Sequence, residues 1–131
     1  DVDMGITLTG LTFLVVDDEV VVREVAARML QKAGATIFKA ANGREAIEIY
    51  KENEKAINGV LLDVTMPKMD GPETAQELKK LNSKLPVVFA SGYPEKEAVK
   101  QLKDWSQPFI QKPFEFKTLI ETFRTVSLTE E

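Results

Sequence analysis

The chain has 131 residues, a typical length for one domain, and 44% of them are hydrophobic, which is enough for a core without disulfides or structural metals. The 17 lysines and arginines against 21 aspartates and glutamates give a net charge of −4, which argues against direct nucleic-acid binding because such proteins usually present a basic surface. Cysteine and histidine are both absent, so any metal must be a hard cation that oxygen atoms bind.

The first half of the chain predicts three strands separated by two helices. Residues 11–16 are apolar at nearly every position and end in β-branched residues, which is typical of a buried strand. Apolar residues at helical spacing then predict a helix from Val21 to Leu30, which Gly34 ends. A second strand, a second helix and a third strand follow, at residues 36–40, from Asn42-Gly43 onward and at residues 57–62.

The second half continues the alternation of strands and helices. Gly71 followed by Pro72 opens a third helix, because proline suits the first position of a helix. A fourth strand, a fourth helix, a short fifth strand and a last helix follow, at residues 86–90, 98–105, 109–110 and 116–123. Strands that alternate with helices in this way predict βαβ crossovers, and therefore a parallel sheet with helices on both faces.

This pattern predicts one α/β domain of the flavodoxin-like, doubly wound type, with five parallel strands in the order 2-1-3-4-5. We expect the domain to cover residues 11–127, with tails at residues 1–10 and 128–131. No apolar run approaches the roughly 20 residues that span a bilayer, and the acidic N-terminus lacks the basic flank of a signal peptide. We therefore expect a cytoplasmic protein that does not bind membranes.

Polar residues follow four of the predicted strands at their carboxyl ends. The first strand ends in Asp17-Asp18-Glu19, the third in Asp63, the fourth in Ser91-Gly92 and the fifth in Gln111-Lys112-Pro113. Open α/β sheets bind their ligands at this edge, and the order 2-1-3-4-5 makes the first and third strands neighbours. We therefore expect Asp17 and Asp18 to lie beside Asp63. Ser91 and Lys112 are expected further along the same edge.

Three carboxylates that crowd together repel one another, and a divalent cation relieves this repulsion. Oxygen ligands that are few in number, completed by water and phosphate, favour Mg²⁺ over zinc. A metal site with one lysine and one hydroxyl group suits phosphoryl transfer, which depends mostly on positioning and charge neutralisation. Each residue also has an ordinary interpretation: Asp17-Asp18 as a helix cap, Asp63 and Lys112 as solvated residues, and Ser91-Gly92 as a turn. Their combination favours the metal site.

Four separated motifs occur in order along the chain: Asp17-Asp18, residues 61–71 (LLDVTMPKMDG), Ser91 and Lys112-Pro113-Phe114. Together they resemble the receiver domains of two-component response regulators, and the likeness runs from about Thr12 to Val126. The resemblance implies a domain that accepts a phosphoryl group from a phosphohistidine in a phosphorelay and then switches conformation. It also implies a substrate and switch with slow self-dephosphorylation, which is not an enzyme in the usual sense.

The resemblance assigns the phosphoacceptor and the metal ligands. Asp63 corresponds to the nucleophile that attacks the phosphorus atom. Asp18 corresponds to a direct ligand of Mg²⁺, Asp17 to a ligand that acts directly or through water, and Asp63 to a third. The backbone carbonyl of Thr65 corresponds to a further ligand.

The resemblance also assigns the residues that contact the phosphoryl group and switch. Lys112 pairs with the phosphoryl oxygens, and the hydroxyl group of Ser91 contacts another of them. Phe109 corresponds to the aromatic residue that turns inward when Ser91 moves, and it lacks the hydroxyl group of the tyrosine often found there, so the inward state rests on packing alone. The Lys112-Pro113 bond is expected to be cis. Residues 105–108 depart from the family's usual Gly-Ala turn, which leaves the shape of the fourth helix open.

The implied partners are a sensor histidine kinase or a histidine phosphotransfer domain, and a further expectation is a homodimer that forms on phosphorylation. The pattern Ser91-Gly92-Tyr93 and the N-terminal segment resemble receivers attached to hybrid sensor kinases, which slightly favours a domain of such a kinase over a stand-alone regulator.

Two other classes of protein share parts of the pattern. Phosphatases of the haloacid dehalogenase kind also place an aspartate nucleophile after a hydrophobic strand, but they carry a second acid where this chain has Thr65, and usually a cap domain. A flavodoxin-like cofactor-binding module is the other alternative. It would need a glycine-rich phosphate loop after the first strand, where this chain has acidic residues instead.

Overall fold

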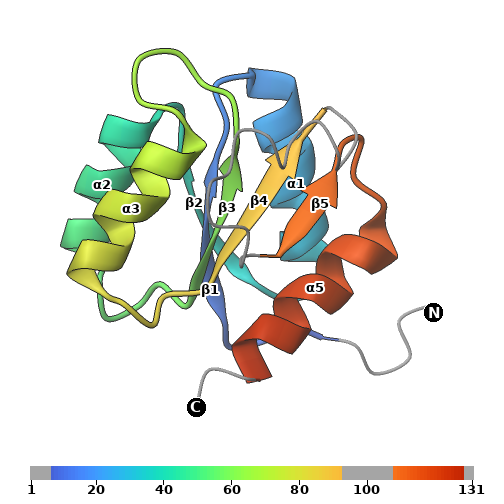
Figure 1. The fold of residues 1–131 in the computed structure, drawn as a ribbon. Coiled ribbons are helices and arrows are strands. Elements are labelled where there is room, and N and C mark those ends of the chain that lie inside the picture. The colour runs from blue at the N-terminus through green and yellow to red at the C-terminus, as the bar shows by residue number, and fades with distance from the viewer. Residues whose placement is uncertain (1–6, 93–107, 129–131) are drawn as a thin grey trace.

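The computed structural model describes residues 7–92 and 108–128, and it contains the predicted alternation of strands and helices (Figure 1). The predicted fourth helix, Tyr93 and residues 105–107 lie outside the described residues. The described elements are β1 (Thr12–Val16), α1 (Val20–Lys32), β2 (Thr36–Ala40), α2 (Gly43–Glu52), β3 (Gly59–Asp63), α3 (Gly71–Leu81), β4 (Val87–Ser91), β5 (Phe109–Gln111) and α5 (Phe116–Leu128).

The five strands form one parallel sheet in the order β2-β1-β3-β4-β5, which confirms the predicted topology. Val16 of β1 pairs with Leu62 of β3, and Asp63 pairs with Ala90 of β4. At the end of β4, Ser91 pairs with Gln111 of β5. This register brings the carboxyl ends of β1, β3, β4 and β5 to the same edge of the sheet.

Helices α2 and α3 begin where the sequence supplies side-chain caps. Asn42 caps α2 because its side chain accepts a hydrogen bond from the backbone N–H of Glu45, at 2.8 Å. Asp70 and Glu73 form a reciprocal capping box at the start of α3, where Pro72 occupies the first turn. After α1, Gly34 adopts a φ of +106°, which a side chain would disfavour.

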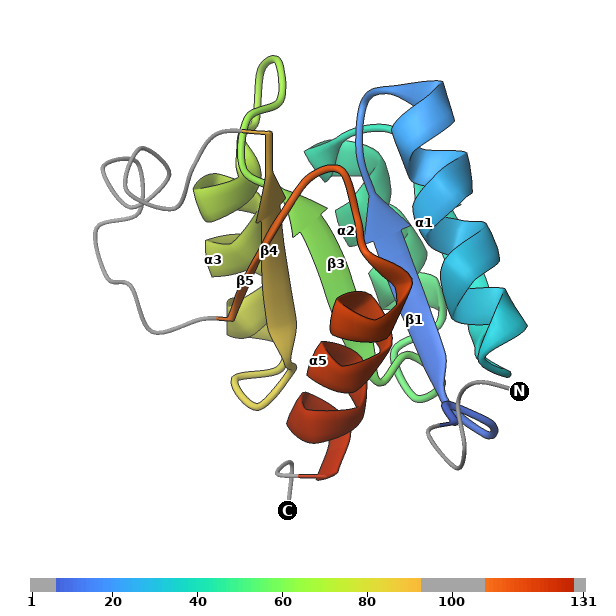
Figure 2. The ribbon, with the colours of Figure 1, turned by 90° about the vertical axis from the view of Figure 1, so that its right-hand side faces the viewer.

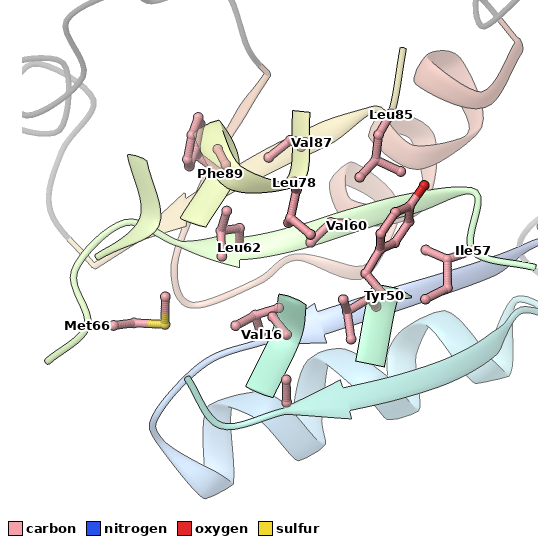
Figure 3. Packing of buried hydrophobic residues seen from close by; sticks show 14 of the residues in the cluster. Val16, Tyr50, Ile57, Val60, Leu62, Met66, Leu78, Leu85, Val87 and Phe89 are labelled. Atoms are coloured by element: carbon pink, nitrogen blue, oxygen red, sulfur yellow. The ribbon is translucent and has the colours of Figure 1, made fainter. Parts of the chain in front are cut away.

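Helices α2 and α3 cover one face of the sheet and α1 and α5 the other (Figures 1 and 2). A hydrophobic layer lies on each face. On one face, Tyr50 of α2 and Leu78 of α3 pack against strand residues such as Val60 (Figure 3). The buried hydroxyl group of Tyr50 accepts a hydrogen bond from Asn82 at 3.1 Å, which satisfies its polar atom. On the other face α1 and α5 pack together, and Phe123 of α5 is fully buried in that layer. The site edge of the sheet therefore rests on a core on both sides.

Residues 7–10, which we expected in an N-terminal tail, pack against the domain. Leu8 is fully buried, and its backbone N–H donates to the carbonyl of Ala33 at 2.8 Å. Arg124 of α5 donates to the carbonyl of Thr7 at 3.1 Å. This segment thus joins the end of α1 to α5. Within the described residues, no helix is long and apolar enough to cross a membrane.

Candidate metal and phosphoryl site

Three carboxylates meet at the carboxyl ends of β1 and β3, as the sequence predicts. One oxygen from each of Asp17, Asp18 and Asp63 lies within 4.8 Å of the other two. The side chains of Asp17 and Asp63 are buried, whereas Asp18 is exposed at the rim. Two buried carboxylates at this separation repel each other, so the cluster needs positive charge.

Lys112 supplies positive charge to this cluster from the loop after β5. Its Nζ lies 2.8 Å from Oδ2 of Asp17 and 3.1 Å from Oδ1 of Asp63, so one ammonium group bridges the two buried carboxylates. The backbone N–H of Lys112 donates to the carbonyl of Ser91 at 2.8 Å, which fixes the loop beside β4. The Lys112-Pro113 peptide bond is cis, as we expected. Lys112 is therefore fixed at two points, by the hydrogen bond of its backbone and by the ion pairs of its ammonium group.

The environment of the site raises the pKa values of both Asp63 and Lys112. Burial, with a further contribution from the charge of Asp17, raises the pKa of Asp63 to about 6, although Lys112 opposes this rise. Burial by itself would lower the pKa of Lys112, but its hydrogen bond to Asp17 and the charge of Asp63 raise it above its ordinary value. One lysine thus compensates the acidic cluster only in part.

The two buried carboxylates differ in the oxygen atoms that they leave available. Oδ1 of Asp17 accepts a hydrogen bond from the backbone N–H of Glu19 at 2.9 Å, and its Oδ2 pairs with Lys112. Asp63 uses Oδ1 for Lys112, and its Oδ2 accepts no hydrogen bond from the described residues. The available oxygens at this edge therefore belong to Asp63 and Asp18.

The structure places Ser91 next to Asp63 and Phe109 on the same face of the sheet. Asp63 pairs with Ala90, so the buried Ser91 lies one residue further along the neighbouring strand. Phe89 and Phe109, which pair with each other, both belong to the α2–α3 layer. Since side chains two residues apart share a face, Ser91 points to that face as well. Phe109 is half-buried there.

The loop after β3 contains the remaining predicted residue, Thr65, which is exposed. The loop is held by a hydrogen bond of 2.9 Å from the backbone N–H of Gly71 to the carbonyl of Val64. A Cβ atom at Gly71 would collide with the backbone oxygen of Asp63 and lie 2.8 Å from the Cα of Val64. Glycine therefore lets α3 begin directly against the backbone that carries Asp63.

A groove of about 520 Å³ opens beside Asp18, between the loops that precede α2 and α3. Its lining carries charges of both signs, with Arg44 and Lys68 as cations and Glu73 as an anion. The groove leaves Asp18 accessible from outside the protein.

Sequence reasoning missed one residue that contacts this site. Arg23 lies in α1, and its guanidinium group donates a hydrogen bond to the backbone carbonyl of Asp17 at 2.8 Å. Its backbone N–H also bonds the carbonyl of Glu19, so Arg23 sits one helical turn after the acidic motif. This spacing was a usable signal, because a long side chain in the first turns of a helix can reach back to the preceding loop.

Comparisons with known proteins point to one family. The family model described as response regulator receiver domain matches residues 13–124. The sensor kinase CckA of Brucella abortus is 39% identical over 94% of the chain, and the chain spans only 13% of that kinase's length. The chemotaxis protein CheY of Thermotoga maritima is 33% identical over 90% of the chain, which covers 98% of CheY.

The fold is shared with solved structures of the same type. The crystal structure of the receiver domain from the hybrid histidine kinase CckA superposes with a TM-score of 0.75 at 34% identity. That comparison covers 88% of this chain and 98% of the solved chain.

The raised pKa of Asp63 predicts how the stability of the domain depends on pH in magnesium-free buffer. A carboxyl group whose pKa is higher in the folded state binds more protons when folded, so the free energy of unfolding should decrease as the pH rises from about 4 to about 6. Asp63→Asn removes the charge. We expect its free energy of unfolding to exceed that of the parent by roughly 1–3 kcal/mol at neutral pH and to equal it near pH 4. Urea unfolding at both pH values measures this difference, and a variant less stable than the parent at neutral pH would contradict it.

Proposed function

The chain belongs to the response regulator receiver domain family of two-component systems, and from that premise we propose that Asp63 accepts a phosphoryl group in a magnesium-dependent reaction. The observation that carries the proposal is the convergence of Asp17, Asp18 and Asp63 on one edge of the sheet, with Lys112 between two of them. The family match supports this function over the phosphatase alternative. Thr65, where such phosphatases carry a second acid, also supports it.

The donor atoms of the site fit Mg²⁺. They are carboxylate oxygens, with no sulfur or imidazole nitrogen among them, and hard divalent cations prefer this set. Asp18 and Asp63 would bind the ion through their available oxygens, together with the backbone carbonyl of Thr65. Asp17 would act through water, because its two oxygens already accept hydrogen bonds from the backbone N–H of Glu19 and the ammonium group of Lys112. When bound, Mg²⁺ supplies charge neutralisation to the carboxylates and the phosphoryl oxygens.

The residues of the chain perform the transfer by positioning and charge. An oxygen of Asp63 attacks the phosphorus of a phosphohistidine, and the new O–P bond forms as the P–N bond breaks. The electron pair of the P–N bond stays on the imidazole nitrogen, so a phosphohistidine protonated at its other nitrogen leaves as neutral imidazole. Lys112 moves its hydrogen bond from Asp63 to the phosphoryl oxygens, and the hydroxyl group of Ser91 donates to another of them.

The covalent product of this reaction is the chain itself, so the domain acts as a substrate and switch. Lys112 and Ser91 share a backbone hydrogen bond of 2.8 Å, which couples a displacement of one to the other. Phe109 lies on the same face as Ser91 and follows it inward when Ser91 moves toward the phosphoryl group. Phosphorylation thus biases a two-state equilibrium of the sheet edge near β5.

The phosphodonor is a histidine-bearing domain of a sensor kinase or a phosphotransfer protein, which places the reaction in the cytoplasm. Such a partner must bring its phosphohistidine to Asp63 and cover the rim of the site. Three valines near the start of α1 form an exposed apolar surface adjoining the acidic loop: Val20 is 60% exposed, Val21 73% and Val25 41%. A partner with an apolar helical surface beside its histidine fits this position.

Asp63→Asn tests the phosphoacceptor directly. With Mg²⁺ and a small phosphodonor such as acetyl phosphate, the parent should gain one phosphoryl group by intact-protein mass spectrometry, and the variant should gain none. Asp70→Asn is the matched control, because Asp70 caps α3 and asparagine serves equally well as a cap, so labelling should persist. A phosphoryl group on the Asp63→Asn protein would reject the assignment.

Val21→Lys tests the partner surface. A charge at this exposed position should slow transfer from a phosphorylated histidine domain by about tenfold or more, since burying it in an apolar interface is costly. Labelling by acetyl phosphate should stay within about twofold of the parent, because the carboxylates are untouched. Leu81→Lys, on α3, is the control and should alter neither rate. If Val21→Lys slows transfer from the histidine domain and from acetyl phosphate equally, Val21 acts on the phosphoryl site and does not contact the partner.

A further inference from the structure

The exposed metal ligand of the proposed site is held only by its backbone. The side chain of Asp18 forms no hydrogen bond or ion pair with residues 7–92 or 108–128, whereas Lys112 holds both Asp17 and Asp63. The position of the Asp18 carboxylate therefore depends on the peptide unit that joins it to Asp17. A group that fixes this peptide unit would preorganise the ligand.

Arg23 makes the contact that fixes this peptide unit. Its Nη1 donates to the backbone carbonyl of Asp17 at 2.8 Å, and its side chain is half-buried. On the other side of the same residue, the backbone N–H of Asp17 donates to the carbonyl of Ala40 at 3.2 Å. The loop is thus tied to β2 at one atom and to α1 at another.

We propose that Arg23 is a positioning residue that orients the Asp17–Asp18 peptide so that Asp18 is placed to bind the divalent cation. The inference rests on the proposed metal-dependent function and assigns Arg23 no contact with the phosphoryl group. Without the guanidinium group the carbonyl of Asp17 loses its partner, and the peptide can rotate. The Asp18 carboxylate must then be ordered at the moment the cation binds, which weakens binding.

Stabilisation of α1 does not explain the arginine. Arg23 lies near the N-terminal end of α1, where the helix dipole disfavours a positive charge. The first turn of α1 carries no acidic residue, and Glu19 at the N-cap, four residues before Arg23, forms no ion pair with it within residues 7–92 and 108–128. The contact with the Asp17 carbonyl is therefore the interaction that this side chain gains from its position.

Arg23→Met tests the inference, because methionine keeps the apolar stem and removes the donors. We expect the dissociation constant for Mg²⁺, measured by isothermal titration calorimetry without any phosphodonor, to increase about tenfold. Arg23→Lys keeps a charged donor on a different side chain, so its dissociation constant for Mg²⁺ should lie between those of Arg23→Met and the parent. At saturating Mg²⁺ the labelling rate with acetyl phosphate should return to within about twofold of the parent. Arg28→Met is the control for loss of an arginine from the same helix, and it should bind Mg²⁺ like the parent.

The possible results separate the inference from the function on which it rests. If Arg23→Met binds Mg²⁺ like the parent, or lowers only the melting temperature, the inference is overturned and the proposed function stands. If Arg23→Met and Arg28→Met weaken binding equally, the effect is the loss of general positive charge, and the inference is again overturned. If the parent itself binds no Mg²⁺ while Asp63 is intact, the proposed function falls together with the inference.

Discussion

The ion pairs that Lys112 makes with Asp17 and Asp63 are the interaction on which this site depends. Two buried carboxylates cannot both stay ionised next to each other without a compensating charge, and one ammonium group lies 2.8 Å and 3.1 Å from them. Asp18 adds a third carboxylate at the rim, and Lys112 pairs with Asp17 and Asp63. This arrangement leaves a group of carboxylates that could hold a metal ion. Among residues 7–92 and 108–128, Lys112 is the cation that pairs with Asp63.

This balance connects the chemistry to the fold. The lysine reaches the carboxylates because the strand order places β1 beside β3 and brings the loop after β5 to the same edge. Its backbone bond to Ser91 joins the charged cluster to β4, so a change of charge at Asp63 acts on two neighbouring strands. A phosphoryl group that draws Lys112 away from Asp63 would thus displace the part of the sheet where Ser91 and Phe109 lie.

The fold and most of the site follow from sequence patterns because parallel strands end at a common edge. Each of these polar residues lies at the carboxyl end of a predicted strand: Asp17, Asp63, Ser91 and Lys112. Together with the strand order 2-1-3-4-5, this position predicts that they meet. The contact of Arg23 with a backbone carbonyl leaves no mark in hydrophobic periodicity, so it was missed. Leu8 was missed for a related reason: its burial depends on Ala33 and the distant α5, which a short N-terminal segment does not reveal.

The proposed function requires that the carboxylates of residues 17, 18 and 63 surround one divalent cation. Amide NMR during a titration with Mg²⁺, and then with beryllofluoride as a phosphoryl mimic, examines this directly. Saturable shifts that begin in the loops after β1 and β3 and extend to Ser91 and Lys112 when beryllofluoride is added are the predicted result. Shifts scattered over the surface without saturation, or a response that survives in the Asp63→Asn protein unchanged, would contradict it.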